Sequence, residues 1–262
     1  MGIKSFVSSR DLPPKFQRYQ LYPTTDGVMA TVYLLDDIYV LKLFDSDTPD
    51  SIIDSEIDLL SKIQNLPIPK VVDRFCIGES SVVIYTQISG KIVATPSYRE
   101  ISQIGTFLKE FHKQSRHIHS TDTQRYGRGE LERLIESTNN HMLQRYLNDI
   151  TLIPQNDGII HGDLFLDNCK FLDGELSGVY DFSDASIGDF HFELAVVSID
   201  WCFVGDRVDD SRVDILLDSY GSSIDRELFV EYIRYALLYY ATTRFVAHRN
   251  YMELFRRLDL LL

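Results

Sequence analysis

Short runs of alternating apolar and polar residues dominate the chain before about residue 90. Two of them, 28–35 and 38–44, flank Asp36 and Asp37 and predict a β-hairpin. A third run, 82–88, predicts a further strand. Alternation with a period of two is typical of strands that bury one face, so this part of the chain is expected to form a small antiparallel sheet.

One stretch among these strands has helical spacing instead. Apolar residues recur three to four positions apart over 53–60, and Thr48 followed by Pro49 offers an N-cap with proline at the first helical position. The helix should end before 66–69, because the two prolines of that segment cannot continue it. One helix is therefore expected beside the sheet.

After about residue 90 the apolar period becomes helical. Three stretches have an apolar face at this spacing: 101–111, 130–147 and 229–240. The helical pattern is interrupted at 158–181, where strand-like runs surround the tight-turn pair Asp173 and Gly174. The pattern predicts an α+β chain with a sheet-rich lobe over 1–88 and a larger, mainly helical lobe over 89–262.

Composition and charge narrow the classes of function. The chain has 262 residues, of which 44% are hydrophobic and 25% charged, as in ordinary globular proteins. It carries 26 basic and 39 acidic side chains, a net charge of −13, so its mean field repels polyanions and nucleic acid is not an expected partner. The same acidity suits cationic small molecules, although it also simply keeps proteins soluble.

Cysteine usage and hydropathy indicate a reducing, aqueous compartment. The three cysteines are far apart and show no C-x-x-C spacing, which argues against a disulfide framework or a zinc site. No apolar stretch reaches the ~18 residues needed to span a bilayer. The first 20 residues also lack an apolar signal core. A cytoplasmic protein without membrane contact, monomeric or homodimeric, is therefore expected.

The candidate chemistry is concentrated in 161–168, which reads H-G-D-L-F-L-D-N, and in Asp181 thirteen residues later. Phosphoryl transfer needs a carboxylate that orients and deprotonates a hydroxyl, together with hard oxygen ligands for Mg²⁺. Asp163, Asn168 and Asp181 supply such groups. Each of them alone would more often cap a turn or end a strand, but their combination at this spacing indicates a phosphotransferase.

These segments resemble the superfamily of aminoglycoside phosphotransferases, choline kinases and homoserine kinases, whose catalytic loop reads H-G/A-D-x-x-x-x-N and whose metal loop begins I-D-F. The resemblance implies a protein-kinase-like, two-lobed fold. It also implies that Asp163 is the catalytic base and that Asn168 and Asp181 bind Mg²⁺. His161 would support the loop backbone, although an imidazole at this position could itself act as a general base.

The resemblance extends into the sheet-rich half and implies a site for ATP or GTP. Lys42 matches the family's phosphate-binding lysine, and Glu56 its carboxylate partner on the first helix. Gly27 belongs to the expected phosphate-covering hairpin, and Thr86 and Ile88 match the positions whose backbone binds the base. Because Lys42 alternates with leucines, its side chain should leave the apolar face of its strand.

The chain departs from the family pattern at the metal loop and just after it. Ser183 stands where relatives have glycine, and the following D-F-H-F-E-L-A replaces the usual D-P-x-x-D-L-A. Glu193 keeps the carboxylate with one more methylene, and Asp189 is expected to support the loop. The absence of the proline alters the expected shape of this segment.

The acceptor is expected to be a small, amine-bearing alcohol. The segments 194–203 and 236–245 resemble bacterial homoserine kinases of this fold, whereas the run D-A-S-I-G-D resembles aminoglycoside enzymes. Asp200, Trp201 and Glu193 are the candidate acceptor residues, and further acids follow at 206–210. A lone tryptophan between apolar neighbours is also a common core residue, and an acid cluster is also a common solvated surface. Homoserine-like acceptors are therefore preferred, with aminoglycosides or choline as alternatives.

Two hypotheses from other classes complete the interpretation. A protein kinase is disfavoured because no A-P-E motif follows Asp181 and little chain is left for an activation loop. A catalytically inactive, nucleotide-binding partner protein is disfavoured because the set of Lys42, Asp163, Asn168 and Asp181 is complete.

Overall fold

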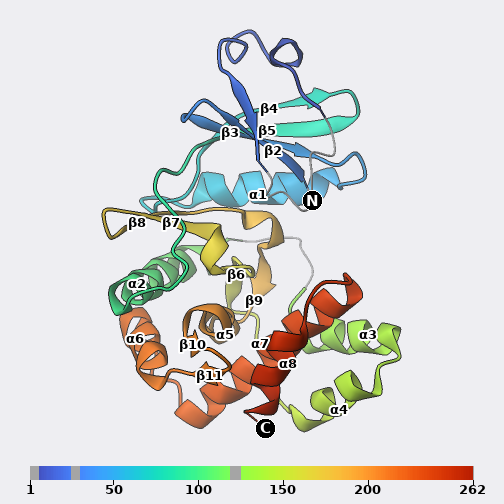
Figure 1. Cartoon of the computed structure of the whole chain (residues 1–262), viewed down its shortest axis with the longest axis vertical. Coiled ribbons are helices and arrows are strands. Elements are labelled where there is room, and N and C mark those ends of the chain that lie inside the picture. The colour runs from blue at the N-terminus through green and yellow to red at the C-terminus, as the bar shows by residue number, and fades with distance from the viewer. Residues whose placement is uncertain (1–5, 25–29, 119–124, 262) are drawn as a thin grey trace. The chain divides into compact units, whose positions relative to one another are not determined.

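The computed structural model describes residues 6–24, 30–118 and 125–261 (Figure 1). The chain divides into two compact units. Unit 1 comprises Met1–Ser89 and Gly178–Ser183, and unit 2 comprises Gly90–Ser177 and Asp184–Leu262. The expected division placed everything after residue 88 in one lobe, whereas here a short return segment that ends at Ser183 belongs to unit 1.

Unit 1 is built on a five-stranded antiparallel sheet in the order β1-β2-β3-β5-β4. The strands are β1 (Leu21–Pro23), β2 (Ala30–Leu35), β3 (Tyr39–Phe44), β4 (Val71–Ile77) and β5 (Ser80–Thr86). The expected hairpin is β2 and β3, and β5 matches the third expected strand. Lys42 on β3 lies opposite Val32 on one side and Val83 on the other. The alternation places Leu41 and Leu43 in the apolar core of the sheet.

The helix of unit 1, α1 (Asp50–Lys62), begins one residue later than expected. Pro49 occupies the N-cap position without a side-chain hydrogen bond, so Thr48 is not the cap. The helix buries Ile53 and Leu60 as its apolar stripe predicts, whereas Ile57 of that stripe is only half-buried. It also buries Glu56. A buried carboxylate needs a partner, which the site described below supplies.

Unit 2 is mainly helical (Figure 1). Its helices are α2 (Tyr98–Ser115), α3 (Arg128–Thr138), α4 (His141–Asp149), α5 (Phe190–Trp201), α6 (Asp210–Tyr220), α7 (Arg226–Val246) and α8 (Met252–Asp259). Helix α5 is almost completely buried and packs against α7, while α2 packs against α6. The single helix expected over 130–147 is instead α3 and α4, because Asn139 adopts a left-handed conformation and Asn140 caps α4.

Three short two-stranded pairs accompany these helices. They are β6 (Gly158–Ile160) with β9 (Ser186–Gly188), β7 (Cys169–Leu172) with β8 (Glu175–Val179), and β10 (Phe203–Val204) with β11 (Arg207–Val208). Asp173 and Gly174 both have positive φ at the β7–β8 turn, as a tight hairpin requires. Strand β8 leaves unit 2 and enters unit 1 at Gly178. No helix within the described ranges is long and apolar enough to cross a membrane.

The packing of α2 against α6 depends on Gly105. A Cβ at this position would overlap Ser219 Oγ and lie 2.8 Å from the carbonyl oxygen of Leu216. Gly105→Ala should therefore destabilise the protein by about 1–3 kcal/mol, as overpacking of a tight contact does. Gly129→Ala on α3 is the matched control, because a Cβ there meets nothing within 4 Å. Urea unfolding should show a loss for the first variant and no loss for the second; equal effects would contradict the packing argument.

Candidate active site

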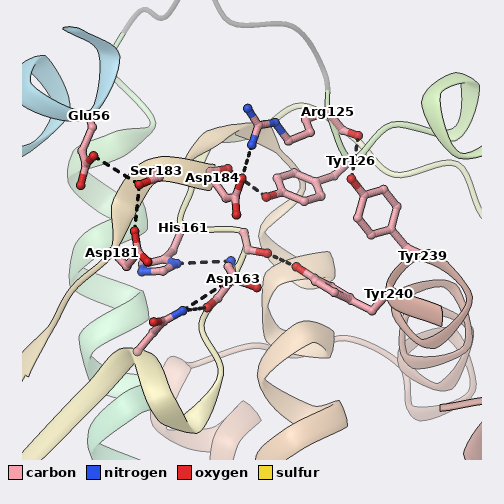
Figure 2. A network of polar contacts seen from close by, with 12 residues as sticks. Glu56, Arg125, Tyr126, His161, Asp163, Asp181, Ser183, Asp184, Tyr239 and Tyr240 are labelled. Atoms are coloured by element: carbon pink, nitrogen blue, oxygen red, sulfur yellow. Dashed lines mark hydrogen bonds and ion pairs between the residues drawn. The ribbon is translucent and has the colours of Figure 1, made fainter. Parts of the chain in front are cut away.

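In unit 1, Lys42 is the centre of a polar cluster on an otherwise apolar strand. Its ammonium donates to Asp181 Oδ1 at 2.7 Å and also to the hydroxyl of Ser183. Glu56 Oε2 lies 3.7 Å from the same nitrogen. The sequence prediction paired Lys42 with Glu56, and the structure brings them together with Asp181 as a second carboxylate. Figure 2 shows Ser183 between Glu56 and Asp181.

Ser183 completes this cluster with a side chain that a glycine would not provide. Its hydroxyl lies 2.8 Å from Asp181 Oδ1 and 3.3 Å from Glu56 Oε2, and it accepts a hydrogen bond from Lys42. The sequence marked Ser183 only as a departure from the family pattern. The contacts show that the hydroxyl links the lysine to both carboxylates.

The backbone around Asp181 is unusual. Asp181 has φ of 64°, in the left-handed region that residues other than glycine seldom adopt. The return segment is held on unit 1 by the amide of Val179, which donates to the carbonyl of Pro67 at 2.9 Å. Gly178 packs so closely on Ile88 that a Cβ would lie 2.7 Å from two of its side-chain atoms. Backbone contacts, as well as the attraction between the two charges, therefore hold Asp181 next to Lys42.

The expected nucleotide-base contacts are only partly described. The amide of Thr86 donates to the carbonyl of Lys70, and the Thr86 hydroxyl accepts from the Lys70 amide, both at 2.9 Å. Ile88 packs against Gly178. Gly27 lies outside the described residues. The roles of these three positions remain predictions.

In unit 2, the segment from His161 to Asn168 forms a compact loop. Asn168 donates its amide to the carbonyl of Asp163 at 2.7 Å and to the Asp163 carboxylate at 3.1 Å. The amide of Asp163 donates to His161 Nδ1 at 3.2 Å, and the His161 side chain is fully buried. Asp163 is therefore held by both residues with which the sequence grouped it, and the imidazole faces the backbone.

Glu193 on α5 holds the loop through its carboxylate. One carboxylate oxygen accepts the amide of Gly162 at 2.8 Å, and the other lies 2.5 Å from His112 Nε2 on α2. The second ring nitrogen of His112 lies 3.0 Å from the hydroxyl of Tyr220. Glu193 is completely buried, so both of its oxygens are satisfied within unit 2. It supports the loop, although the sequence also proposed it as an acceptor residue.

Two further side chains hold the loop, one from α5 and one from α7. Asp200, at the end of α5, accepts the amide of Leu166 at 2.8 Å. Tyr240 on α7 donates its hydroxyl to the carbonyl of Gly162. Gly162 has φ of 78°, and a Cβ there would overlap the ring of Tyr126, so this position requires glycine. Figure 2 shows the tyrosines gathered around the loop.

The remaining candidates from the sequence cap a helix, pack in the core or form ion pairs with arginines. Asp189 caps α5 through the amides of His191 and Phe192 and also accepts from the Tyr232 hydroxyl. Trp201 is fully buried in unit 2, edge-on to Phe171. The acids of the 206–210 segment each have an arginine partner: Asp206 with Arg256, Asp209 with Arg212 and Asp210 with Arg226. Of the acids expected near the acceptor, Asp200 and Glu193 both accept hydrogen bonds from the 161–168 loop.

The expected Mg²⁺ ligands fall in different units, Asn168 in unit 2 and Asp181 in unit 1. Asn168 turns its amide nitrogen toward Asp163, so its amide oxygen is the atom that would be able to coordinate a cation. The Asp181 side chain is 48% exposed. No group of three or more His, Cys, Asp or Glu gathers into a metal cluster in the described part of the chain. Such sparse oxygen donors fit Mg²⁺, which takes much of its coordination from phosphates and water.

A model of the phosphotransferase enzyme family matches residues 23–230, a range that contains Lys42, Glu56, Asp163, Asn168 and Asp181. The chain belongs to this family. Family membership confirms that it is an enzyme of the small-molecule kinase class. The solved structures that it resembles, described below, confirm the expected protein-kinase-like fold.

Several curated relatives are homoserine kinases. The one from Methylobacillus glycogenes is 27% identical over 250 residues, covering 84% of this chain and 78% of the relative. The one from Methylocella silvestris is 52% identical over 46 residues, and the one from Polaromonas naphthalenivorans is 37% identical over 65 residues. These two matches cover 18% and 24% of this chain, and they span only 14% and 21% of the relatives' lengths.

Two of the solved structures that resemble this one carry the names of small-molecule kinases. An aminoglycoside phosphotransferase in complex with GDP and kanamycin has a TM-score of 0.68 at 16% identity, covering 92% of this chain and 91% of that chain. A choline/ethanolamine kinase family protein from Mesorhizobium loti has a TM-score of 0.69 at 12% identity, covering 95% and 90%. At these identities the likeness is one of fold.

Sequence reasoning missed the residues that reach the site from distant elements. His112, Tyr240 and Tyr126 contact Glu193, Gly162 and Asp184 from other parts of unit 2. Tyr240 lies in an apolar stretch and looks like an ordinary core residue, while His112 and Tyr126 have mainly polar sequence neighbours and belong to no motif. No local spacing connects them to the loop, so the sequence carried no signal for their partners.

The pKa of Glu56 leads to a pH-dependent prediction. Burial raises the pKa of this carboxyl, Lys42 opposes the rise, and Asp181 adds to it. When a carboxyl has a higher pKa in the folded chain than in the unfolded chain, the free energy of unfolding falls as the pH rises above the ordinary pKa of that carboxyl, 4.5. The wild type should therefore become progressively less stable than Glu56→Gln between about pH 4 and pH 8.

Urea unfolding of both proteins across this range measures the difference. Glu79→Gln, which removes an exposed carboxylate from the same unit, is the matched control. A difference between wild type and Glu56→Gln that stays constant with pH would show that burial of the ionised carboxylate does not govern this position.

Proposed function

We propose that the protein transfers the γ-phosphate of ATP or GTP to the hydroxyl of a small amino alcohol such as homoserine. The observation that carries the proposal is the position of Asp163, whose carboxylate and backbone are both bound by Asn168 within the catalytic loop. Family membership supports the reaction class, and the names of the curated relatives support the acceptor.

Asp163 is the group that would handle the acceptor. A partly exposed carboxylate can accept the proton of a bound hydroxyl while the oxygen attacks phosphorus. Asn168 fixes the orientation of that carboxylate, and Glu193 and Tyr240 fix the backbone just before it. Positioning matters here because phosphoryl transfer depends on geometry and charge more than on covalent chemistry.

The cluster of unit 1 would serve the nucleotide. Lys42 would contact its phosphates, with Glu56 and Ser183 orienting the ammonium. Asn168 and Asp181 would hold Mg²⁺, which neutralises phosphate charge when bound. In the described structure Asp181 is paired with Lys42, so phosphate and metal would compete with this ion pair for both side chains.

The alternative acceptor is an aminoglycoside. It is favoured by the run D-A-S-I-G-D at 184–189 and by the name of a structural relative. Homoserine is preferred because a curated homoserine kinase matches most of the chain. Neither argument identifies the acceptor by itself, so the two classes are compared directly.

The acceptor is identified by measuring nucleotide consumption with homoserine, choline, methylthioribose and aminoglycosides, with mass spectrometry of the products. Homoserine should be phosphorylated, and Asp163→Asn should lower kcat by about 100-fold or more because the proton acceptor is lost. Asp173→Asn, an exposed turn residue with positive φ that asparagine tolerates, is the control. Phosphorylation of aminoglycosides alone would refute the amino alcohol, and full activity of Asp163→Asn would refute the base.

Asp181→Asn tests the metal ligand. A neutral amide binds a hard cation more weakly than a carboxylate, so the Mg²⁺ concentration for half-maximal turnover should rise about tenfold or more. Asp37→Asn makes the same charge change at an exposed position in the β2–β3 turn and should leave the Mg²⁺ titration unchanged. Saturation of Asp181→Asn at the wild-type Mg²⁺ concentration, with equal turnover, would exclude it as a ligand.

A further inference from the structure

Arg244 on α7 is a partly buried cation without an ionic partner in the described part of unit 2. The other partly buried arginines of this unit are each paired with a carboxylate: Arg125, Arg128, Arg212, Arg226, Arg234 and Arg257. A guanidinium that is partly removed from water binds carboxylate or phosphate well through paired N–H donors. An anionic group is therefore the expected partner of Arg244.

Arg244 lies beside the catalytic loop. Its guanidinium carbon is 5.7 Å from the ring centroid of Phe165, which follows Asp163 by two residues. Tyr240, one helical turn earlier on α7, packs edge-on against the same ring at 4.9 Å between centroids and donates to the carbonyl of Gly162. This face of α7 thus contacts the loop that carries the candidate base, and it places a cation next to it.

The surroundings of Arg244 also contain negative charge. Burial raises the pKa of the Asp200 carboxyl, and the nearby positive charges of Arg257 and Arg244 oppose that rise. Asp200 uses Oδ2 to accept the amide of Leu166 in the loop. A carboxylate and a guanidinium next to one loop complement a ligand that carries both signs of charge, as an α-amino acid does.

We propose that Arg244 binds the carboxylate of the acceptor, so that the acceptor is an α-amino acid with a side-chain hydroxyl. This inference rests on the proposed function and names the substrate class of the same site. The hydroxyl is placed at Asp163, the carboxylate at Arg244, and the ammonium on the side of Asp200. Choline and aminoglycosides carry no carboxylate. They would leave the guanidinium unpaired and bring a second positive charge toward it.

The test compares homoserine with 3-aminopropan-1-ol, which is the same amino alcohol without the carboxylate. The wild type should prefer homoserine. Arg244→Gln should raise the KM for homoserine by about 10- to 100-fold, because a charge-assisted bidentate contact is lost, and change kcat much less. The KM for 3-aminopropan-1-ol and for the nucleotide should stay within about threefold of the wild type. Turnover of the decarboxylated acceptor also shows that the variant is folded.

Two further variants define the effect. Arg249→Gln makes the same charge change at an exposed position five residues later and should leave every KM unchanged. Arg244→Lys keeps the charge without the planar fork and should recover part of the affinity for homoserine. Recovery by lysine separates binding of the carboxylate from a role in packing on Phe165.

Four results would overturn the inference. Equal effects of Arg244→Gln on both acceptors would show that the arginine does not recognise the carboxylate. A rise in the nucleotide KM alone would assign Arg244 to phosphate. A wild type that phosphorylates homoserine no better than 3-aminopropan-1-ol would remove the carboxylate preference while leaving the proposed kinase intact. A wild type that phosphorylates neither compound would refute the amino-alcohol function and this inference together.

Discussion

The catalytic loop depends on one buried carboxylate, that of Glu193. A carboxylate that is completely removed from water is costly unless both oxygens are bound, and here one accepts the Gly162 amide while the other contacts His112. Through this residue α5 and α2 fix the backbone just before Asp163. The loop can then present a partly exposed carboxylate in a defined position, because its own polar groups are already satisfied by Asn168 and His161.

In the polar cluster around Lys42 in unit 1, buried charged groups are likewise held by partners within the cluster. Lys42 and Glu56 are both largely buried, and Asp181, which is half exposed, shares the ammonium with Glu56. Two carboxylates for one cation leave an excess of negative charge. Burial raises the pKa of Glu56, and the charge of Asp181 adds to the rise. The Ser183 hydroxyl lies among all three and adds hydrogen bonds that a glycine could not make. The cluster is therefore compact and carries more negative than positive charge.

Local patterns were enough to predict much of this arrangement. The alternation around Lys42 fixed the face of its strand, and the spacing from Asp163 to Asn168 predicted a loop in which the two side chains meet. The prediction of one helix over 130–147 was wrong, because the apolar pattern continues through a break between two helices. The apolar stripe over 130–147 runs across Asn139 and Asn140, whose conformations end one helix and begin another. The pairing of Glu193 with His112 was beyond reach, because 81 positions separate them and His112 belongs to no motif.

Net charge was the least informative property for the acceptor. The chain carries −13 overall, which suggested a negative pocket for an amine. In the structure the acids after Trp201 are neutralised one by one: Asp206, Asp209 and Asp210 each pair with an arginine, and Asp209 also caps α6. Beside the loop, which itself carries Asp163 and Asp167, lie the partly buried carboxylate of Asp200 and one cation without a carboxylate partner in the described chain, Arg244. Recognition of a small ligand depends on such close groups, because surface charges separated by more than about 10 Å are screened by salt. For a small ligand, groups this close to the loop therefore outweigh the mean field of the chain.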